Sequence, residues 1–383
     1  MSYKINGTEV IDNEGRGVLA GAYCGNYNTD AGQQGAIEGD IVYDANKGAN
    51  FFWNGSKWVP AGGAPTSPYL DISVSTNSNV IISDASDPMG GTWRTLYCLV
   101  STTLDVKSLS SDPTLNVVKY FIVGGGGGSV TAGAGGGTSG AGGGGGGVIT
   151  GLMTVNYGQV PVTVGSGAAL GTTAKANPGG TSRVGAVRAE GGGGGLHKTK
   201  EKTGTNYGNG ASGGGAFWQS SESGLLGNFQ PNTTTPAYQL PQGHNGGGGY
   251  RNAASWGANG GGGGAGGAGQ TSNGNSNSNR GGIGVQSPDW VDNSYGDNGW
   301  FGGGGCGGWQ RHMGAPSYGQ SSPQQGGGGY GMGSTGQSTQ RLYGLPNSGG
   351  GGGGKTTEDP GAGAYGDGGA GGSGFVALKW RIA

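Results

Sequence analysis

The sequence predicts an all-β or irregular protein in which small N-terminal β domains precede a glycine-rich polyglycine II helix sandwich with flanking β-strands and distal loops. Three observations support this prediction. Glycine supplies 101 of the 383 residues, mostly in blocks; short β-prone runs recur; and the N-terminal part lacks helical periodicity. Because glycine loses the most backbone entropy on folding and has no side chain to bury, this composition requires an unusual form of packing.

Residues 1–63 are expected to form a small β-meander. They are the least glycine-rich part of the chain and contain two β-prone, aromatic runs. The pair Asn54-Gly55 within the second run is a hairpin signal. Trp53 and Trp58 are interpreted as the core of this meander, with a binding role as the less favoured alternative.

Residues 64–116 are expected to form a β-rich connecting segment. A joint rich in Pro, Gly and Ser separates them from the meander, and short apolar runs then alternate with turn residues. The run 93–100 has the composition of a buried strand, and nothing in it has the appearance of a catalytic motif.

Residues 117–383 are expected to form the glycine-rich domain. The apolar run 117–123 leads directly into five consecutive glycines. Strands are predicted at 148–155 and 160–164, and a closing strand at 374–382 is expected to pair with an early one. The glycine blocks recur at irregular spacing, which argues against a solenoid of fixed period.

A glycine block can adopt polyproline II geometry, with three residues per turn and its N–H and C=O groups pointing outward. Helices without Cβ atoms can pack closely enough for N–H and Cα–H donors to reach carbonyl oxygens of their neighbours, which satisfies the backbone without a sheet. A collagen helix is excluded because the glycines come in blocks rather than at every third position. Nine Trp, sixteen Tyr and seven Phe at a net charge of −1 favour order over disorder.

Large aromatic side chains are concentrated in the segments between the glycine blocks, together with Asn and Ser. This composition is similar to that of antibody paratopes, where Tyr and Trp give rigid contact area and small polar residues give adaptable hydrogen bonds. An equally weighted alternative is that about half of these aromatics close the ends of the glycine lattice as its hydrophobic core. The candidate binding residues are Trp218, Tyr250, Trp256, Trp290, Tyr295, Trp300, Phe301, Trp309, His312, Tyr318 and Tyr330.

Several other functions are disfavoured, and no enzyme is predicted. The 20 basic and 21 acidic residues leave no charge excess for binding nucleic acid. The three histidines and three cysteines lack metal-ligand spacing, so neither a metal nor a cofactor is expected, and the cysteines are interpreted as reduced thiols. Acidic residues are too sparse in the glycine-rich part to favour a glycosidase carboxylate pair.

Two further patterns argue against nucleotide binding and membrane integration. The six glycines before Lys355 and Thr356 match a phosphate-binding loop only literally, since no buried strand precedes them and no long helix follows. The chain shows no signal-peptide pattern and no apolar run of membrane-spanning length, so an integral membrane protein is not expected.

The strand 120–123 that leads into the glycines, the segment 157–167 and the closing run 371–380 form a recognisable pattern. In these features residues 117–383 resemble the glycine-rich receptor-binding adhesins at the tail-fibre tips of T-even-type bacteriophages. The resemblance implies a sandwich of polyglycine II helices whose distal loops contact the bacterial surface. The N-terminal start is similar to that of some cyanophage virion proteins, which implies attachment to the virion or fibre through residues 1–63.

The leading hypothesis is therefore a phage tail-fibre adhesin that binds a host-cell surface receptor, either an outer-membrane protein or a glycan. Its other expected partners are virion tail proteins, and it is expected to be a homotrimer or a cap on a trimeric fibre. The expected location is the virion, in the tail fibre or baseplate, after synthesis in the host cytoplasm. The alternative is a purely structural virion component, such as a fibre, baseplate or capsid decoration, whose loops contact other virion proteins.

Overall fold

The structure is a computed structural model and is almost entirely β. Its one helical element among the described residues is the 3₁₀ turn η1 (Pro113–Leu115), so the predicted all-β class is confirmed. No helix in the described part of the chain has the length and apolar character needed to cross a membrane. The structure describes the backbone of seven strands within residues 3–60, the backbone of 251, 309 and 310, and in full residues 68–87, 90–130, 140–171, 176–196, 210–217, 242–250, 257–273, 279–308, 323–331, 341–355 and 368–383.

The N-terminal strands form one seven-stranded sheet in sequence order. All neighbouring pairs are antiparallel except β4 and β5, which are parallel. The strands on either side of the predicted hairpin signal Asn54-Gly55 pair antiparallel, with Trp53 opposite Trp58, while residues 54–57 and the side chains of these tryptophans lie outside the described residues. The strands are β1 (Tyr3–Ile5), β2 (Thr8–Ile11), β3 (Gly17–Leu19), β4 (Ala22–Cys24), β5 (Ile41–Asp44), β6 (Ala49–Trp53) and β7 (Trp58–Pro60).

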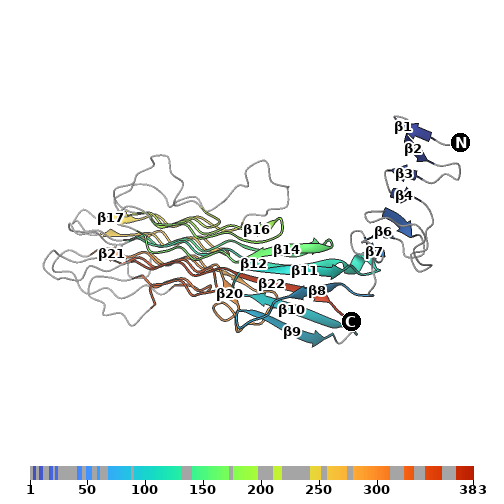
Figure 1. Ribbon diagram of the computed structural model, residues 1–383. Coiled ribbons are helices and arrows are strands. Elements are labelled where there is room, and N and C mark those ends of the chain that lie inside the picture. Colours follow the sequence, from blue (N-terminus) through green and yellow to red (C-terminus); the bar gives the residue numbers. More distant parts are fainter. Residues whose placement is uncertain are drawn as a thin grey trace.

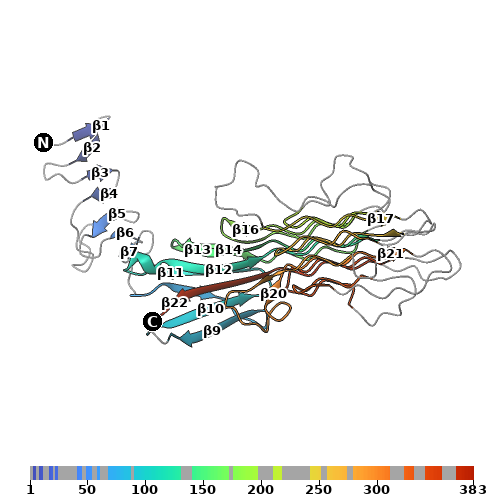
Figure 2. The same cartoon turned by 180° about the vertical axis from the view of Figure 1, so that it is seen from behind.

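Two five-stranded antiparallel sheets pack face to face in a β-sandwich (Figures 1 and 2). The first sheet has the order β13-β12-β22-β10-β9, and the second has the order β16-β15-β14-β11-β8. Their strands are β8 (Asp71–Val74), β9 (Val80–Ser86), β10 (Thr92–Cys98), β11 (Thr102–Ser108), β12 (Val117–Val123), β13 (Val148–Thr154), β14 (Gly158–Thr163), β15 (Ser182–Val184), β16 (Val187–Ala189) and β22 (Phe375–Arg381).

The sandwich core is made of aliphatic side chains and one tryptophan that alternate along these strands. Leu96, Leu104, Ile122, Leu378 and Trp380 are all fully buried between the sheets. The closing strand β22 lies between β10 and β12, which confirms the predicted pairing of the last strand with an early one.

The two sheets contain strands from both sides of residue 117, where the glycine-rich domain was predicted to begin. Strands β8 to β11 precede it, yet β9 and β10 share a sheet with β12, β13 and β22, while β8 and β11 share the other sheet with β14 to β16. Neither half can bury its apolar face without the other, because each sheet contains strands from both sides of the boundary. Residues 69–116 are therefore part of the same folded body as the glycine-rich region.

Beyond the sandwich, the glycine blocks pack side by side as extended segments, which appear in Figure 1 as a bundle of wavy tubes lying alongside one another. The backbone amides of residues 124–129 donate hydrogen bonds to three neighbouring segments in turn, so that every third amide reaches the same segment, with N···O distances of 2.8 to 3.0 Å. The three partner pairs are Gly147 and Gly144, Gly180 and Asn177, and Gly372 and Gly369. This repeat of three is that of the polyproline II helix, so the predicted polyglycine II lattice is present.

Segment 140–147 is surrounded by other glycine segments. Its amides donate in turn to segments 349–355, 259–264 and 190–196, the first reached three times and the other two twice each, always at intervals of three residues. Its carbonyl oxygens accept bonds from three others, segments 124–130, 210–217 and 302–308. The backbone of this segment is thus satisfied by six neighbours, none of which is an adjacent strand of a sheet.

Absence of side chains is a geometric requirement of this lattice. A Cβ built on Gly143 would lie closer than 3.0 Å to the carbonyl oxygens of Gly127 and Gly128, and Gly142 and Gly146 face backbone carbonyls of other segments equally closely. The Cα–H groups of these glycines therefore point at neighbouring carbonyl oxygens, as expected for weak Cα–H···O bonds.

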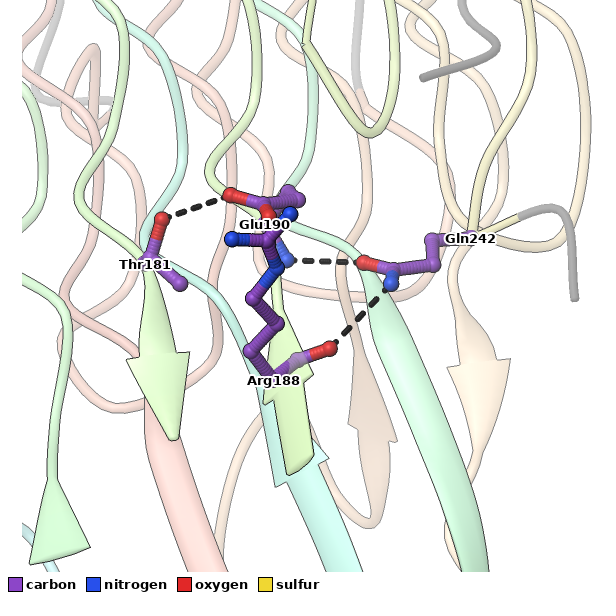
Figure 3. Close-up of polar contacts among 4 residues, drawn as sticks. All are labelled: Thr181, Arg188, Glu190 and Gln242. Carbon is purple, nitrogen blue, oxygen red and sulfur yellow. Dashed lines mark hydrogen bonds and ion pairs between the residues drawn. The ribbon is translucent and has the colours of Figure 1, made fainter. Parts of the chain in front are cut away.

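A polar cluster joins the sandwich to the lattice (Figure 3). The side-chain amide of Gln242 accepts a hydrogen bond from the Glu190 N–H at 2.7 Å and donates one to the Arg188 carbonyl oxygen at 3.2 Å. Glu190 also accepts from the Thr181 hydroxyl at 2.7 Å and forms a 2.8 Å ion pair with Arg188. Gln242 is 3% exposed, so its buried side-chain amide satisfies the backbone N–H and C=O groups that a neighbouring segment would otherwise bond.

Candidate functional site

The lattice has two distinct ends, which we call the sandwich end and the tip. The sandwich end is where Gly124 follows β12 and Gly147 precedes β13. At the tip the far ends of other segments meet, since the Gly308 N–H donates to the Gly140 carbonyl oxygen at 2.9 Å and the Gly140 N–H donates to that of Lys355 at 3.0 Å.

The tip carries a small three-stranded sheet, β17-β18-β21 (Figure 1). Its strands are β17 (Tyr250–Arg251), β18 (Gly257–Ala258) and β21 (Trp309–Gln310). The register pairs Tyr250 with Ala258 and Ala258 with Trp309, so these three residues form one row across the sheet. Two candidate residues separated by nearly sixty positions in the sequence are thus placed two strands apart, about 10 Å between backbones.

Tyr330 lies on the same half of the lattice as this sheet. Its N–H donates to the Arg341 carbonyl oxygen at 2.9 Å, and its neighbour Gly331 packs against the Gly307 carbonyl oxygen, two residues before Trp309. Tyr250 and Tyr330 are both half-buried. Trp218, Trp256, His312 and Tyr318 lie outside the described residues, as does the side chain of Trp309.

The remaining four candidates lie at the sandwich end, away from the tip sheet. They belong to the segment 285–301, which begins with β19 (Val285–Gln286) and ends with β20 (Trp300–Phe301), and whose two strands pair with each other. This segment covers the outer face of the first sheet, where Trp290 and Tyr295 pack against a second apolar cluster that includes Phe121 and Phe375.

The proposal that Phe301 contacts a receptor is corrected by its burial. Its side chain is fully buried, with ring centroids 5.1 Å from those of both Phe121 and Phe375. Tyr295 packs 4.7 Å from the ring of Tyr97, and burial raises the pKa of both phenols above its ordinary value. These residues fit the alternative in which aromatic side chains supply the core that glycine lacks.

The segment 285–301 is also anchored to the lattice by a carboxylate. One Asp297 oxygen accepts the N–H groups of Gly326 and Gly327 at 3.0 and 3.1 Å. The Asp292 carboxylate accepts the N–H of Ser294 at 2.8 Å, which closes a local turn. Within the described ranges no three His, Cys, Asp or Glu side chains converge as a metal site.

The literal phosphate-loop match at 349–354 is explained by the lattice. The amides of Gly351, Gly352 and Gly353 donate at 2.8 Å to carbonyl oxygens of three other segments. An amide committed to a buried carbonyl is not available to a phosphate, so this run serves packing instead.

Two cysteines are buried free thiols, in agreement with the predicted reduced state. Cys98 lies in β10, where burial raises its thiol pKa to about 12. Cys306 lies inside the glycine segment 302–308, and burial raises its pKa to about 11. The side chain of Cys24 lies outside the described residues.

Comparison with known proteins agrees with this architecture. A family model described as a glycine-rich domain matches residues 103–381, from β11 to the end of β22, which is well over half of the chain. The matched range includes strands on both sides of residue 117, as the shared sheets require. No curated protein sequence matches the chain. The protein therefore belongs to the glycine-rich domain family.

Proposed function

We propose that this protein is a receptor-binding adhesin of a bacteriophage tail fibre, which contacts the host-cell surface through residues at the lattice tip. In this proposal it is a virion protein attached through its N-terminal segment, either as a homotrimer or as a cap on a trimeric fibre. The sandwich and lattice form a rigid support, and residues carried on such a support contact a ligand at low entropic cost.

The observation that supports this proposal best is the row Tyr250, Ala258 and Trp309 at the tip. It brings aromatic residues from two separate parts of the chain to the end farthest from the sandwich, on strands that bound segments rich in Asn and Ser. Tyr and Trp are the residues enriched at protein recognition surfaces, because they bury a large area with few rotatable bonds.

The division of the candidate aromatics between two ends supplies a matched test. We would measure saturable binding of the full chain to a panel of bacterial strains, comparing the wild type with Tyr250→Ala and Trp309→Ala. Trp300→Ala is the control, because it removes the same side chain as Trp309→Ala but at the sandwich end. Circular dichroism would establish that each variant folds.

The adhesin proposal expects each tip substitution to weaken cell binding by at least tenfold, which corresponds to about 1.4 kcal/mol or more. Trp300→Ala is expected to bind like the wild type. If a bound strain is found and both tip variants bind it unchanged, recognition does not use this row. If the folded wild type binds no strain, the purely structural virion component becomes the better explanation.

A further inference from the structure

The outer face of the first sheet is divided into two halves. The half next to the lattice is covered by segment 285–301. On the other half, toward the start of β12 and the end of β22, the register places Leu152, Lys119, Lys379 and Thr95 in one row across β13, β12, β22 and β10. Trp93 follows in the next row of the same sheet face. We call the surface formed by Lys119, Leu152, Lys379 and Trp93 the lysine face.

The two lysines of this face are direct cross-strand partners that share one aromatic ring. The ammonium groups of Lys119 and Lys379 lie 5.0 and 5.5 Å from the centroid of the Trp93 ring. The pKa of Lys379 is lowered, mainly by partial burial and to a smaller extent by the positive charge of Lys119. Like charges placed directly opposite each other on neighbouring strands are destabilising, and cation–π contacts offset only part of that cost.

Acidic groups near this pair do not neutralise it. Asp87 is the carboxylate whose charge acts on Lys379, and one of its oxygens accepts the indole N–H of Trp93 at 3.0 Å. The ion pairs formed among the described residues involve Arg94, Lys107 and Arg188, and neither lysine of this face. Among the described residues, neither of these two ammonium groups forms an ion pair with a carboxylate.

We propose that the lysine face binds an acidic segment of another virion protein, with a carboxylate placed between Lys119 and Lys379. This inference rests on the proposed function, because it assigns the sandwich end to the particle side of the adhesin. Charge complementarity supports it: a carboxylate bound there would accept hydrogen bonds from both ammonium groups and remove their repulsion.

A protein segment fits the surroundings better than an anionic glycan. Leu152, the neighbour of Lys119 in the row, is 65% exposed and offers an apolar contact beside the charges. The Trp93 ring, on which a sugar could stack, already has both ammonium groups within 5.0 and 5.5 Å of its centroid. Lys119 lies near the start of β12, at the opposite end of that strand from Gly124, where the lattice begins.

The test uses the full-length chain and two probes of equal charge. A fluorescein-labelled hexaglutamate peptide with blocked ends represents the acidic segment, and a labelled sialic acid hexamer represents an anionic glycan. Binding would be followed by fluorescence anisotropy at low and high salt. The variants are Lys119→Gln, Lys379→Gln and the double substitution. Lys107→Gln is the matched control, since it removes one charge from an exposed lysine on the opposite sheet.

The proposal expects wild-type binding of hexaglutamate that weakens with salt, a tenfold or greater loss in the double variant, and less than twofold change in Lys107→Gln. Equal binding of hexaglutamate by the wild type and the double variant, or no binding to either, would overturn it. Binding of the sialic acid hexamer alone through these lysines would also overturn it and assign the face to a glycan.

Host-cell binding separates this inference from the adhesin proposal. The double lysine variant is expected to bind cells like the wild type, whereas Tyr250→Ala and Trp309→Ala are expected to keep hexaglutamate binding. Loss of cell binding in the double lysine variant would place receptor contacts on the sandwich and contradict the assignment of this face to the particle side.

Discussion

The substitution Gly143→Ala tests whether the glycine lattice itself stabilises the protein. Gly143 lies in the segment enclosed by six neighbours, and its N–H donates to the Gly352 carbonyl oxygen at 2.8 Å. A methyl group at this position would lie within 3.0 Å of three backbone atoms of Gly127 and Gly128. Since none of these belongs to a flexible side chain, segment 124–130 must retreat by about 1 Å to restore ordinary contact.

That displacement disrupts bonds that segment 124–130 makes with other neighbours. The Gly127 carbonyl oxygen accepts from Gly352, and the Gly128 carbonyl oxygen accepts from Gly195, at 2.8 and 2.9 Å. Weakening two buried backbone hydrogen bonds costs about 2 kcal/mol, and overpacking adds about 1–3 kcal/mol. Reduced entropy of the unfolded chain returns only about 0.4–1 kcal/mol. We therefore expect a net loss of about 3 kcal/mol in the free energy of unfolding.

Gly267→Ala is the matched control, because its new methyl group would meet the Ile283 Cγ2 atom at 3.0 Å and then nothing closer than 3.8 Å. Unfolding would be followed by calorimetry and by urea titration. Gly143→Ala is expected to lower the midpoint temperature by about 4 °C, while Gly267→Ala stays close to the wild type. Equal midpoints for Gly143→Ala and the wild type would refute close backbone packing around this segment.

Three further outcomes are expected. Phe301→Ala should lower the free energy of unfolding by about 3–5 kcal/mol because it empties a fully buried aromatic site, and a loss under 1 kcal/mol in urea titration would contradict its core position. Gln242→Ala should cost about 1–3 kcal/mol, since it leaves the Glu190 N–H without its side-chain acceptor; wild-type stability would show that this bond is dispensable. In a Cys24→Ser background, thiol reagents at pH 8 should label Cys98 and Cys306 only after unfolding, because burial raises both pKa values and keeps the thiols protonated; rapid labelling of the native protein would contradict this.

Much of the fold could be predicted from local sequence. Glycine blocks without a collagen repeat leave few ways to satisfy a backbone, and close packing of threefold helices is one that needs no side chains. The apolar runs at 117–123 and 374–382 predicted β12 and β22, because buried central strands require continuous β-prone residues. Composition alone also identified the aromatic residues that a glycine scaffold must either bury or present.

The pairing of strands across residue 117 could not be predicted in this way. The change from ordinary to glycine-rich composition is sharp there, yet strand partners are chosen by register and shape across long separations. Leu378 pairs with Leu96 on one side and with Tyr120 on the other, and no local pattern specifies such a contact. The lysine face was missed for the same reason, since Lys119 and Lys379 are neighbours only in the sheet.

The sequence by itself determined the kind of backbone packing, because a residue without Cβ is required wherever a neighbouring carbonyl oxygen occupies the side-chain position. Only the tertiary structure decided which aromatic residues are buried against the sandwich and which lie on the strands of the tip. Phe301 and Tyr295 lie on a segment folded back onto the sandwich, whereas Tyr250 and Trp309 meet across Ala258 at the tip. The physical reason is that the same residue type is buried or exposed according to the segment that packs beside it, and that choice depends on contacts hundreds of residues apart.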